Sequence, residues 1–227
     1  MEKFEARSYQ VFIKIIDPQQ RLATDLTGRL PVISKQEHKY LFIIYEYDSK
    51  SILIHPMKAR TDTKFIHILQ DLHEHLITRG LNPNYMGLEN EASLELQDLL
   101  KEKEIDYQLA PPGINQHNTE YGSIIKFRDH FISGLFLTYP YFPMQNWDLL
   151  LKNVEITLNL LLPSRLNPRL SKYSQMNGKF YFNQTPMAST YTENPVHNNP
   201  HNRGIWAPPI QKVCYVRPAM LHQRCLT

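Results

Sequence analysis

Residues 84–111, NYMGLENEASLELQDLLKEKEIDYQLAP, contain a strand, a helix and a second strand in one short stretch. NYMGLE is an apolar run typical of a buried strand, and it ends at the acid Glu89. EASLELQDLLKEK then has helical spacing from Glu91 onwards, and IDYQLAP returns to a strand pattern. A helix that crosses between two neighbouring strands requires them to run parallel, with a right-handed connection.

The segments before this stretch predict the rest of an α/β sheet. YLFIIYE at 40–46 and SILIHPM at 51–57 are β-rich apolar runs joined by YDSK, which is the form of a hairpin. LATDLTG at 22–28 reads as a strand that ends in a turn. Over residues 61–79 the apolar side chains recur at intervals of three and four, and Gly80 follows as a stop signal. The predicted order is βββαβαβ.

Two more helices are predicted before the pattern loosens. One runs from about Thr119 to Leu135, and MQNWDLLLKNVEITLNLLL at 144–162 supplies the other. Beyond Pro163 only GKFYFNQTP and KVCYVRP look like strands, in a segment rich in proline and asparagine. The sequence therefore predicts a core over residues 1–162 and an extension over residues 163–227.

Composition excludes several classes of protein. The 227 residues are 42% hydrophobic and 21% charged, which suits a globular chain with a sizeable core. No apolar run could span a bilayer and the charged N-terminus has no apolar signal region, so we expect no membrane contact and a nuclear or cytoplasmic location. Cys214 and Cys225 cannot form a disulfide framework, and their spacing with His197 and His201 does not fit a structural zinc site.

The basic residues are concentrated late in the chain. The extension carries eight lysines and arginines against one acid, and eight of the sixteen prolines. Such a segment can follow the phosphates of a nucleic acid, and it can equally be a poorly ordered, solvated tail. Its candidate phosphate contacts are Arg165, Arg169 and Lys172.

Three acids occupy positions where strands end and a helix starts. Asp25 ends the first strand, Glu89 ends the fourth, and Glu120 begins the helix after the fifth. In two-metal nucleases and transferases, carboxylates on neighbouring elements hold Mg²⁺ or Mn²⁺ ions about 3.5–4 Å apart. Each acid also has a structural explanation, because Asp25 can cap a turn and the two glutamates suit helix N-termini.

Seven stretches of the chain carry a family resemblance: TDLTGRLPVISKQEHKYLFIIYEYDSKSILIHPMKART, GLENEAS, YQLAPPGINQHN, KFRDHFISGL, FPMQNWDLLLKNVEITLNLLLPSRLNPRLSKY, GKFYFNQTPMA and RGIWAPP. Through them the chain resembles, over nearly its whole length, the DDE-type integrase catalytic core of retrotransposon Pol polyproteins. The resemblance implies an RNase H-like α/β fold, with a five-stranded mixed sheet flanked by helices and a small Pro-rich extension. It also implies DNA as a partner, a possible homo-oligomer and, in active members, metal-assisted joining of DNA 3′ hydroxyls to a target phosphodiester.

The catalytic acids of that family are only partly kept. The first aspartate falls on Asp25, and the second falls on Glu89, where GLENEAS stands in place of LDNEAS. The longer side chain can displace its carboxylate by about 1 Å, and such a displacement can lower a rate roughly 10²-fold. Without a gap in the alignment the third acid falls on Tyr121, while Glu120 lies one residue early, which turns a helical side chain by about 100°.

We therefore interpret the chain as a degenerate, integrase-like copy that binds nucleic acid and has an inactive strand-transfer site. Lys126 and Arg128 are the helix residues that can face DNA, although the adjacent Asp129 makes a solvated helix face an equal alternative. Asp25 and Glu89 are the metal ligands if Mg²⁺ or Mn²⁺ binds. One alternative is an active Mg²⁺-dependent polynucleotidyl transferase that uses both of these acids and Glu120. The other is a degraded reading frame or a protein-interaction module without DNA binding. No phosphate-loop motif predicts a nucleotide cofactor.

Overall fold

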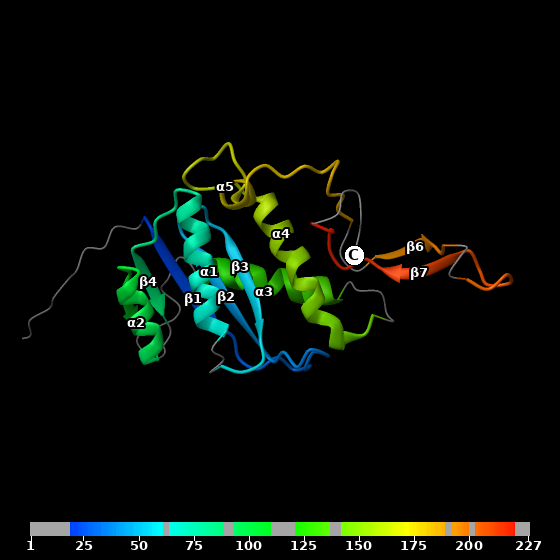
Figure 1. The fold of residues 1–227 in the computed structure, drawn as a ribbon, viewed down its shortest axis with the longest axis horizontal. Helices are drawn as coiled ribbons and strands as arrows, with labels where there is room; N and C mark the ends of the chain where they lie inside the picture. The colour runs from blue at the N-terminus through cyan, green and yellow to red at the C-terminus, as the bar shows by residue number, and fades with distance from the viewer. Residues whose placement is uncertain are drawn as a thin grey trace, which may run out of the picture.

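The computed structural model describes residues 19–60, 64–88, 93–109, 121–136, 142–188, 192–199 and 203–220. Its centre is a five-stranded sheet of order β3-β2-β1-β4-β5 (Figure 1). β1, β2 and β3 form an antiparallel meander, while β4 is parallel to β1 and β5 is parallel to β4. This is the mixed sheet of the RNase H-like class, so the predicted fold is confirmed. The strands are β1 (Arg21–Leu26), β2 (Tyr40–Glu46), β3 (Ile52–Met57), β4 (Tyr85–Leu88) and β5 (Asp106–Leu109).

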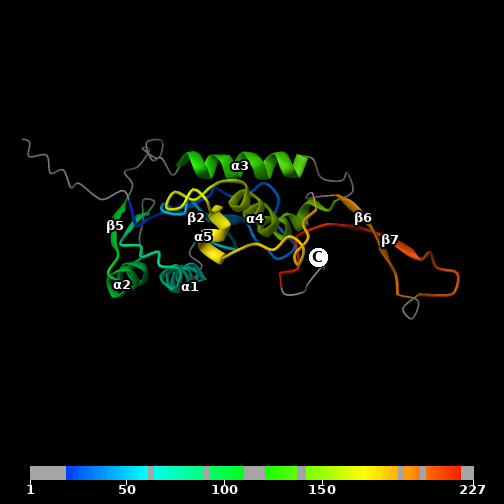
Figure 2. The same ribbon diagram turned by 90° about the horizontal axis from the view of Figure 1, so that it is seen from above.

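Helices cover both faces of the sheet. Helices α1 (Lys64–Thr78) and α2 (Leu94–Glu102) lie on one face and α3 (Tyr121–Phe136) lies on the other (Figure 2). The 3-10 helix η2 (Met144–Leu150) leads into α4 (Leu151–Leu161), which lies alongside β3. The predicted helix over 144–162 is therefore two segments, a 3-10 helix that is itself interrupted at Asn146 (φ −102°, ψ 16°) and an α-helix that follows it directly at Leu151.

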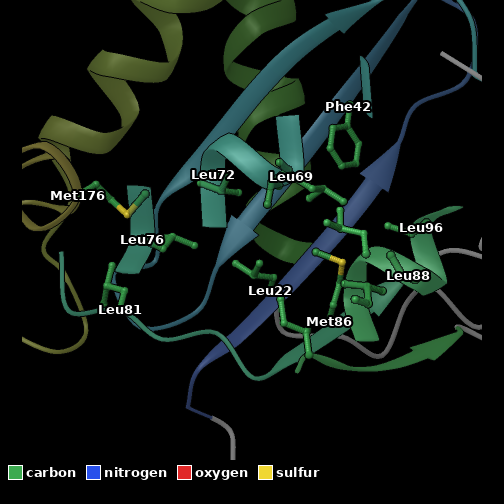
Figure 3. Close-up of a cluster of buried hydrophobic side chains, with 14 of the residues drawn as sticks. Leu22, Phe42, Leu69, Leu72, Leu76, Leu81, Met86, Leu88, Leu96 and Met176 are labelled. Carbon is green, nitrogen blue, oxygen red and sulfur yellow. The ribbon is translucent and has the colours of Figure 1, made fainter. Parts of the chain in front are cut away.

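The first hydrophobic core lies between the sheet and the helices α1 and α2 (Figure 3). Phe42 and Ile44 point to this face from β2, as Met86 and Leu88 do from β4. Fully burying a side chain of this size contributes about 1.5–3 kcal/mol, so this layer is a main source of stability. Met176 joins the same core from helix α5 (Lys172–Asn177).

The second core lies on the opposite face. The alternate residues of β2, Leu41, Ile43 and Tyr45, point into it and meet Phe131 of α3 and Trp147 of η2. The aromatic rings of Phe131 and Trp147 are 6.3 Å apart between centroids, in an edge-to-face arrangement. Because both faces of β2 are buried, its sequence is a continuous apolar run and does not alternate.

Some predicted boundaries are wrong. Helix α2 begins at Leu94 and not at Glu91, since Ser93 is extended and its hydroxyl accepts a hydrogen bond from the backbone N–H of Leu96 at 3.2 Å. GKFYFNQTP at 178–186 forms no strand, because its backbone turns where the N–H groups of Gln184 and Thr185 donate to the carbonyl oxygen of Tyr181 at 3.0 and 2.9 Å.

A second, two-stranded sheet lies late in the chain. Within KVCYVRP the predicted strand is confirmed as part of β7 (Ile210–Cys214), which pairs antiparallel with β6 (Glu193–His197). The boundary at residue 162 stays a prediction, although Met176 and Tyr215 from beyond it are buried. Among the described residues, no helix combines the length and the apolar character needed to cross a lipid bilayer.

Candidate functional site

Asp25 lies near the end of β1, in the middle of the sheet. Side chains alternate along a strand, so Asp25 shares a face with Ala23, which packs against the second core beneath α3. Ala23 is the register partner of Gly87 on β4. On the other side, the register partner of Asp25 is Ile43 of β2, which is buried in the second core, and the side chain of Asp25 itself is half-exposed.

The carboxylate of Asp25 is available to a cation. Within the described part of the chain, no hydrogen-bond or ion-pair partner engages it. Carboxylate oxygens are the ligands that Mg²⁺ prefers, so Asp25 fits one position of a metal site. The described residues contain no group of three histidine, cysteine, aspartate or glutamate side chains that could hold a metal ion, so a complete ligand set would need acids from elsewhere in the chain.

The other members of the predicted site are only partly located. Glu89 and Glu120 lie outside the described residues. Gly87 of β4 pairs with Ala23 of β1, and β4 ends at the following residue, Leu88. Because β1 and β4 run parallel, both strands end at the same edge of the sheet. Tyr121 is the first residue of α3. The structure therefore places Asp25 and the start of α3, and the meeting of the predicted site residues stays a prediction.

A cation that the sequence analysis missed lies beside the end of β1. Thr27, two residues after Asp25, accepts a hydrogen bond on its hydroxyl from the backbone N–H of Leu41 at 2.9 Å. Arg60 donates from Nη2 to the carbonyl oxygen of Thr27 at 3.2 Å and lies 5.7 Å from the ring centroid of Tyr40. The predicted hairpin could have suggested this position, because the end of β3 must lie near the start of β2.

Two of the predicted nucleic-acid contacts are exposed on α3. Phe127 and Phe131 point into the second core, so Lys126 and Arg128 lie on the outer part of the helix. Arg128 Nε lies 3.5 Å from Asp129 Oδ1, but both side chains are mostly exposed. A surface ion pair of this kind is worth about 0–1 kcal/mol, so it would not prevent Arg128 from binding a phosphate.

The two arginines between α4 and α5 differ in their surroundings. Arg169 is exposed. Arg165 is half-buried, with its guanidinium carbon 3.4 Å from the ring centroid of Tyr47, and its backbone N–H donates to the carbonyl oxygen of Asp48 at 3.2 Å. The guanidinium of Arg165 therefore stacks on the turn between β2 and β3, which anchors the loop there.

Lys172 is buried, with 4% of its surface exposed. Burial, and then the nearby charges of Lys50 and Lys126, lower the pKa of Lys172 from 10.5 to about 8. An ammonium group in this setting is not part of an open basic surface.

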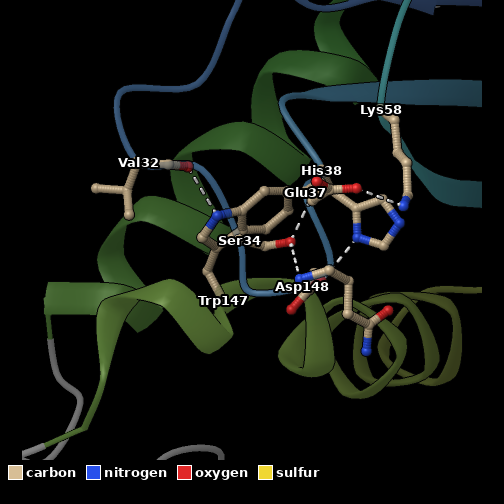
Figure 4. Close-up of polar contacts among 8 residues, drawn as sticks. Val32, Ser34, Glu37, His38, Lys58, Trp147 and Asp148 are labelled. Carbon is tan, nitrogen blue, oxygen red and sulfur yellow. Dashed lines mark hydrogen bonds and ion pairs between the residues drawn. The ribbon is translucent and has the colours of Figure 1, made fainter.

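A buried His–Asp pair was also missed. His38 Nδ1 lies 2.7 Å from Asp148 Oδ2, which joins the loop before β2 to η2 (Figure 4). In the same region Trp147 Nε1 donates to the carbonyl oxygen of Val32 at 2.9 Å, and Ser34 Oγ accepts from the backbone N–H of His38 at 3.0 Å. A cavity of about 290 Å³ adjoins the pair, lined in part by Gln36, Pro56, Lys152 and Arg217. The two partners are 110 residues apart in the chain, so no local pattern predicts the contact.

No protein-family profile and no curated protein matches this sequence. Among solved structures, the chain is similar to one in the cryo-electron-microscopy structure of a simian T-cell lymphotropic virus intasome in complex with PP2A regulatory subunit B56 gamma. The two chains are 16% identical with a TM-score of 0.47, and the match covers 94% of this chain and 80% of the other.

Proposed function

We propose that this chain is an integrase-like protein that binds duplex DNA and has an impaired strand-transfer site. The observation that carries the proposal is the position of Asp25. It presents a carboxylate without a partner among the described residues, from the central strand of an RNase H-like sheet and beside the parallel strand β4. A retained first acid supports descent from a metal-dependent polynucleotidyl transferase.

Exposed cations support DNA binding. Lys126 and Arg128 lie on the outside of α3, Arg60 lies beside the turn that follows Asp25, and Arg169 lies in the loop after α4. Lysine and arginine side chains on a surface neutralise phosphates and release counterions, so the binding that they support weakens with salt. Self-association stays a prediction.

The count of acids supports an impaired site. Two-metal transfer needs several carboxylates on neighbouring elements, and here Glu89 is one methylene longer than aspartate while Tyr121 stands where the third acid falls in an ungapped alignment. A phenol has an ordinary pKa of about 10, so Tyr121 would be neutral near pH 7 and a poor ligand for Mg²⁺. The proposal is therefore binding without efficient chemistry.

DNA binding can be tested by fluorescence anisotropy with a labelled duplex between about 50 and 200 mM salt. We expect the double variant Lys126→Gln with Arg128→Gln to bind more weakly and to flatten the plot of log affinity against log salt by up to about 2. Lys101→Gln, which removes an exposed lysine from α2 on the other face of the sheet, is the matched control and should bind like the unmodified protein.

Two results would favour the alternatives. If the unmodified protein shows no salt-dependent affinity for duplex DNA, the chain is better explained as a degraded reading frame or a protein-interaction module. If it joins labelled DNA ends to a target duplex in Mg²⁺ or Mn²⁺, it is an active polynucleotidyl transferase that uses Asp25 with Glu89 and Glu120. Failure of either assay is interpretable only with protein whose folding has been checked by circular dichroism.

A further inference from the structure

Two neighbouring aromatic side chains are exposed shortly after helix α5. The segment KFYF at 179–182 follows Gly178, the C-cap of this helix. Phe180 keeps 8% of its surface exposed, whereas Tyr181 and Phe182 keep 53% and 60%. Single exposed apolar residues are ordinary on a protein surface, but adjacent large ones mark a surface that contacts a partner.

The ring of Phe182 is held in place through two further aromatic rings. Its centroid lies 4.8 Å from that of Phe180, with an angle of 67° between the planes. Phe180 in turn lies 5.3 Å from Tyr173 of α5 at 87°, so both contacts are edge-to-face. Met176 of the same helix is buried in the first core. Since the exposed ring rests on an anchored element, it has little freedom left to lose when a ligand binds.

A lysine lies over the other exposed ring. Lys179 Nζ is 5.3 Å from the ring centroid of Tyr181, within the range of a cation–π contact, and the lysine itself is exposed. The sequence contains no aspartate or glutamate between Glu155 and Glu193. No acid of this stretch therefore competes for the ammonium group.

Arg79 brings a second exposed cation from a distant part of the chain. It follows the end of α1, and its Nη2 donates to the carbonyl oxygen of Asn177 at 3.2 Å, 98 residues away in the sequence. Its Nη1 lies 3.7 Å from the position that a Cβ atom would take on Gly178. A guanidinium has five N–H donors, so fixing one of them leaves others for a phosphate. The fold, and not the local sequence, places this cation beside the aromatic segment.

This surface is separate from the cations proposed to bind duplex DNA. Helix α5 joins the first core, which α1 and α2 cover, whereas Lys126 and Arg128 lie on α3, on the opposite face of the sheet (Figure 2). In a duplex, both faces of each base are covered by the neighbouring base pairs. An aromatic side chain therefore stacks on a base where the strand is unpaired.

We propose that a platform for single-stranded nucleic acid is formed by two rings and two cations, Tyr181, Phe182, Lys179 and Arg79. Bases stack on the rings, and the cations neutralise the phosphates beside them. A protein partner would also cover the rings, but two exposed cations and a stretch without acids favour a polyanion. The inference goes beyond the proposed duplex binding and does not depend on it. DNA and RNA strands share this chemistry, so the experiment has an arm for each.

Fluorescence anisotropy with end-labelled oligothymidylate and oligouridylate of about 12 nucleotides measures the affinity for each kind of strand. We expect a platform variant, Tyr181→Ala with Phe182→Ala, to bind single strands about 5- to 100-fold more weakly, because stacking on both rings is lost. Both side chains are exposed, so this variant should fold, which circular dichroism checks. Trp206→Ala removes a ring that is 96% exposed elsewhere on the surface, and this control should bind like the unmodified protein.

Two single variants separate the contributions of stacking and charge. Phe182→Leu keeps an apolar side chain without an aromatic face, so we expect it to bind single strands more weakly than the unmodified protein. Lys179→Gln should flatten the plot of log affinity against log salt by about 0.7, the value for one phosphate contact with a single strand. The strand that the unmodified protein binds more tightly identifies DNA or RNA as the partner. A leucine variant that binds as tightly as the unmodified protein would overturn base stacking and favour a protein partner.

A duplex probe separates this inference from the proposed function. The platform variant should bind duplex DNA like the unmodified protein. If the unmodified protein binds single strands but no duplex, the proposed function fails and the platform stands. If it binds neither kind of single strand, or if the platform variant loses duplex and single-strand affinity equally, the inference is overturned.

Discussion

Asn159 of α4 makes two hydrogen bonds with the backbone of one residue on the edge strand, Ile52. Its Oδ1 accepts from the N–H at 3.0 Å and its Nδ2 donates to the carbonyl oxygen at 2.7 Å. One turn earlier on α4, Glu155 Oε2 accepts from the N–H of Ile54 at 3.0 Å. Pro56 is the next residue of β3 whose backbone nitrogen faces away from β2, and as a proline it has no N–H to satisfy. Side chains of a helix thus satisfy an edge that a further strand would otherwise pair with.

We expect Asn159→Ala to lower the free energy of unfolding by about 2–4 kcal/mol, because it leaves the N–H and the carbonyl of Ile52 buried without partners. Urea denaturation followed by circular dichroism measures the change. Thr157→Ala, on the same helix, should change stability by less than about 0.5 kcal/mol. Equal losses in the two variants would mean that α4 contributes through packing and not through these hydrogen bonds.

The pair of His38 and Asp148 predicts a second effect on stability. Asp148→Ala removes the partner of a buried imidazole, so we expect a loss of about 1–3 kcal/mol of unfolding free energy. Asp148→Asn keeps an oxygen that can accept from Nδ1, and it should lose less. Because Trp147 adjoins the pair, its fluorescence can follow the local change during unfolding. If the asparagine variant is as unstable as the alanine variant, the charge of the carboxylate matters more than its oxygen.

Metal affinity can test the interpretation of the acids. We expect weak binding of Mn²⁺ by the unmodified protein and tighter binding by the double variant Glu89→Asp with Tyr121→Glu, which restores a third carboxylate. Isothermal titration calorimetry measures both. Adding Asp25→Asn to the double variant should remove the gain if Asp25 belongs to the same site.

Strand transfer provides the matching readout of activity. The unmodified protein should give no detectable joining of DNA ends in Mg²⁺ or Mn²⁺. Detectable joining that Glu120→Gln abolishes would contradict this expectation. It would show that Glu120, and not Tyr121, occupies the third position and that the ungapped alignment is wrong.

The lowered pKa of Lys172 predicts how stability depends on pH. Between a folded-state pKa of about 8 and the ordinary value of 10.5, the unfolded chain binds more protons than the folded chain at this residue. The cost of burying the cation is therefore complete below pH 8 and disappears as the pH rises toward 10.5. At about 1.4 kcal/mol per pKa unit the full shift corresponds to roughly 3 kcal/mol, and solvent screening of the incompletely buried ammonium reduces this cost to on the order of 1–2 kcal/mol.

We therefore expect Lys172→Met to be more stable than the unmodified protein by about 1–2 kcal/mol near pH 7, with the difference closing by about pH 10.5. Urea denaturation of both proteins across this range, in buffer without phosphate, gives the difference directly. If the difference in unfolding free energy between the two proteins does not change with pH, the packing of the methionine side chain causes that difference and the charge of Lys172 costs little stability.

The sheet could be predicted because its signals are local. The apolar run of β2, the hairpin residues at 47–50 and the helical spacing of α1 each occur within one segment, and together they fix the order of strands. The starts of helices were less certain. At α2, both Glu91 and Ser93 can begin a helix, and only the hydrogen bond to the hydroxyl of Ser93 identifies the N-cap.

The polar contacts could not be predicted because they join distant segments. Glu155 and Asn159 look like ordinary polar positions of an amphipathic helix, yet their partners on β3 are 101 and 107 residues away. Lys172 looked like one more cation of a basic tail, since composition cannot show which lysine is buried. Asp25 was identified as a site residue through its place before a turn and through family resemblance, and both of these are properties of the sequence.

The hairpin of β6 and β7 leaves the molecule as an arm (Figures 1 and 2). Tyr215 directly follows β7, and its buried phenol donates to Asn153 Oδ1 of α4 at 3.3 Å. The same phenol also bonds the backbone of Ala188, which lies in the segment before β6. The outgoing and returning segments therefore meet at one anchor, while Ile205 and Trp206 near the far end are 93% and 96% exposed. An arm built in this way can lengthen, shorten or change its sequence during evolution without any rearrangement of the central sheet.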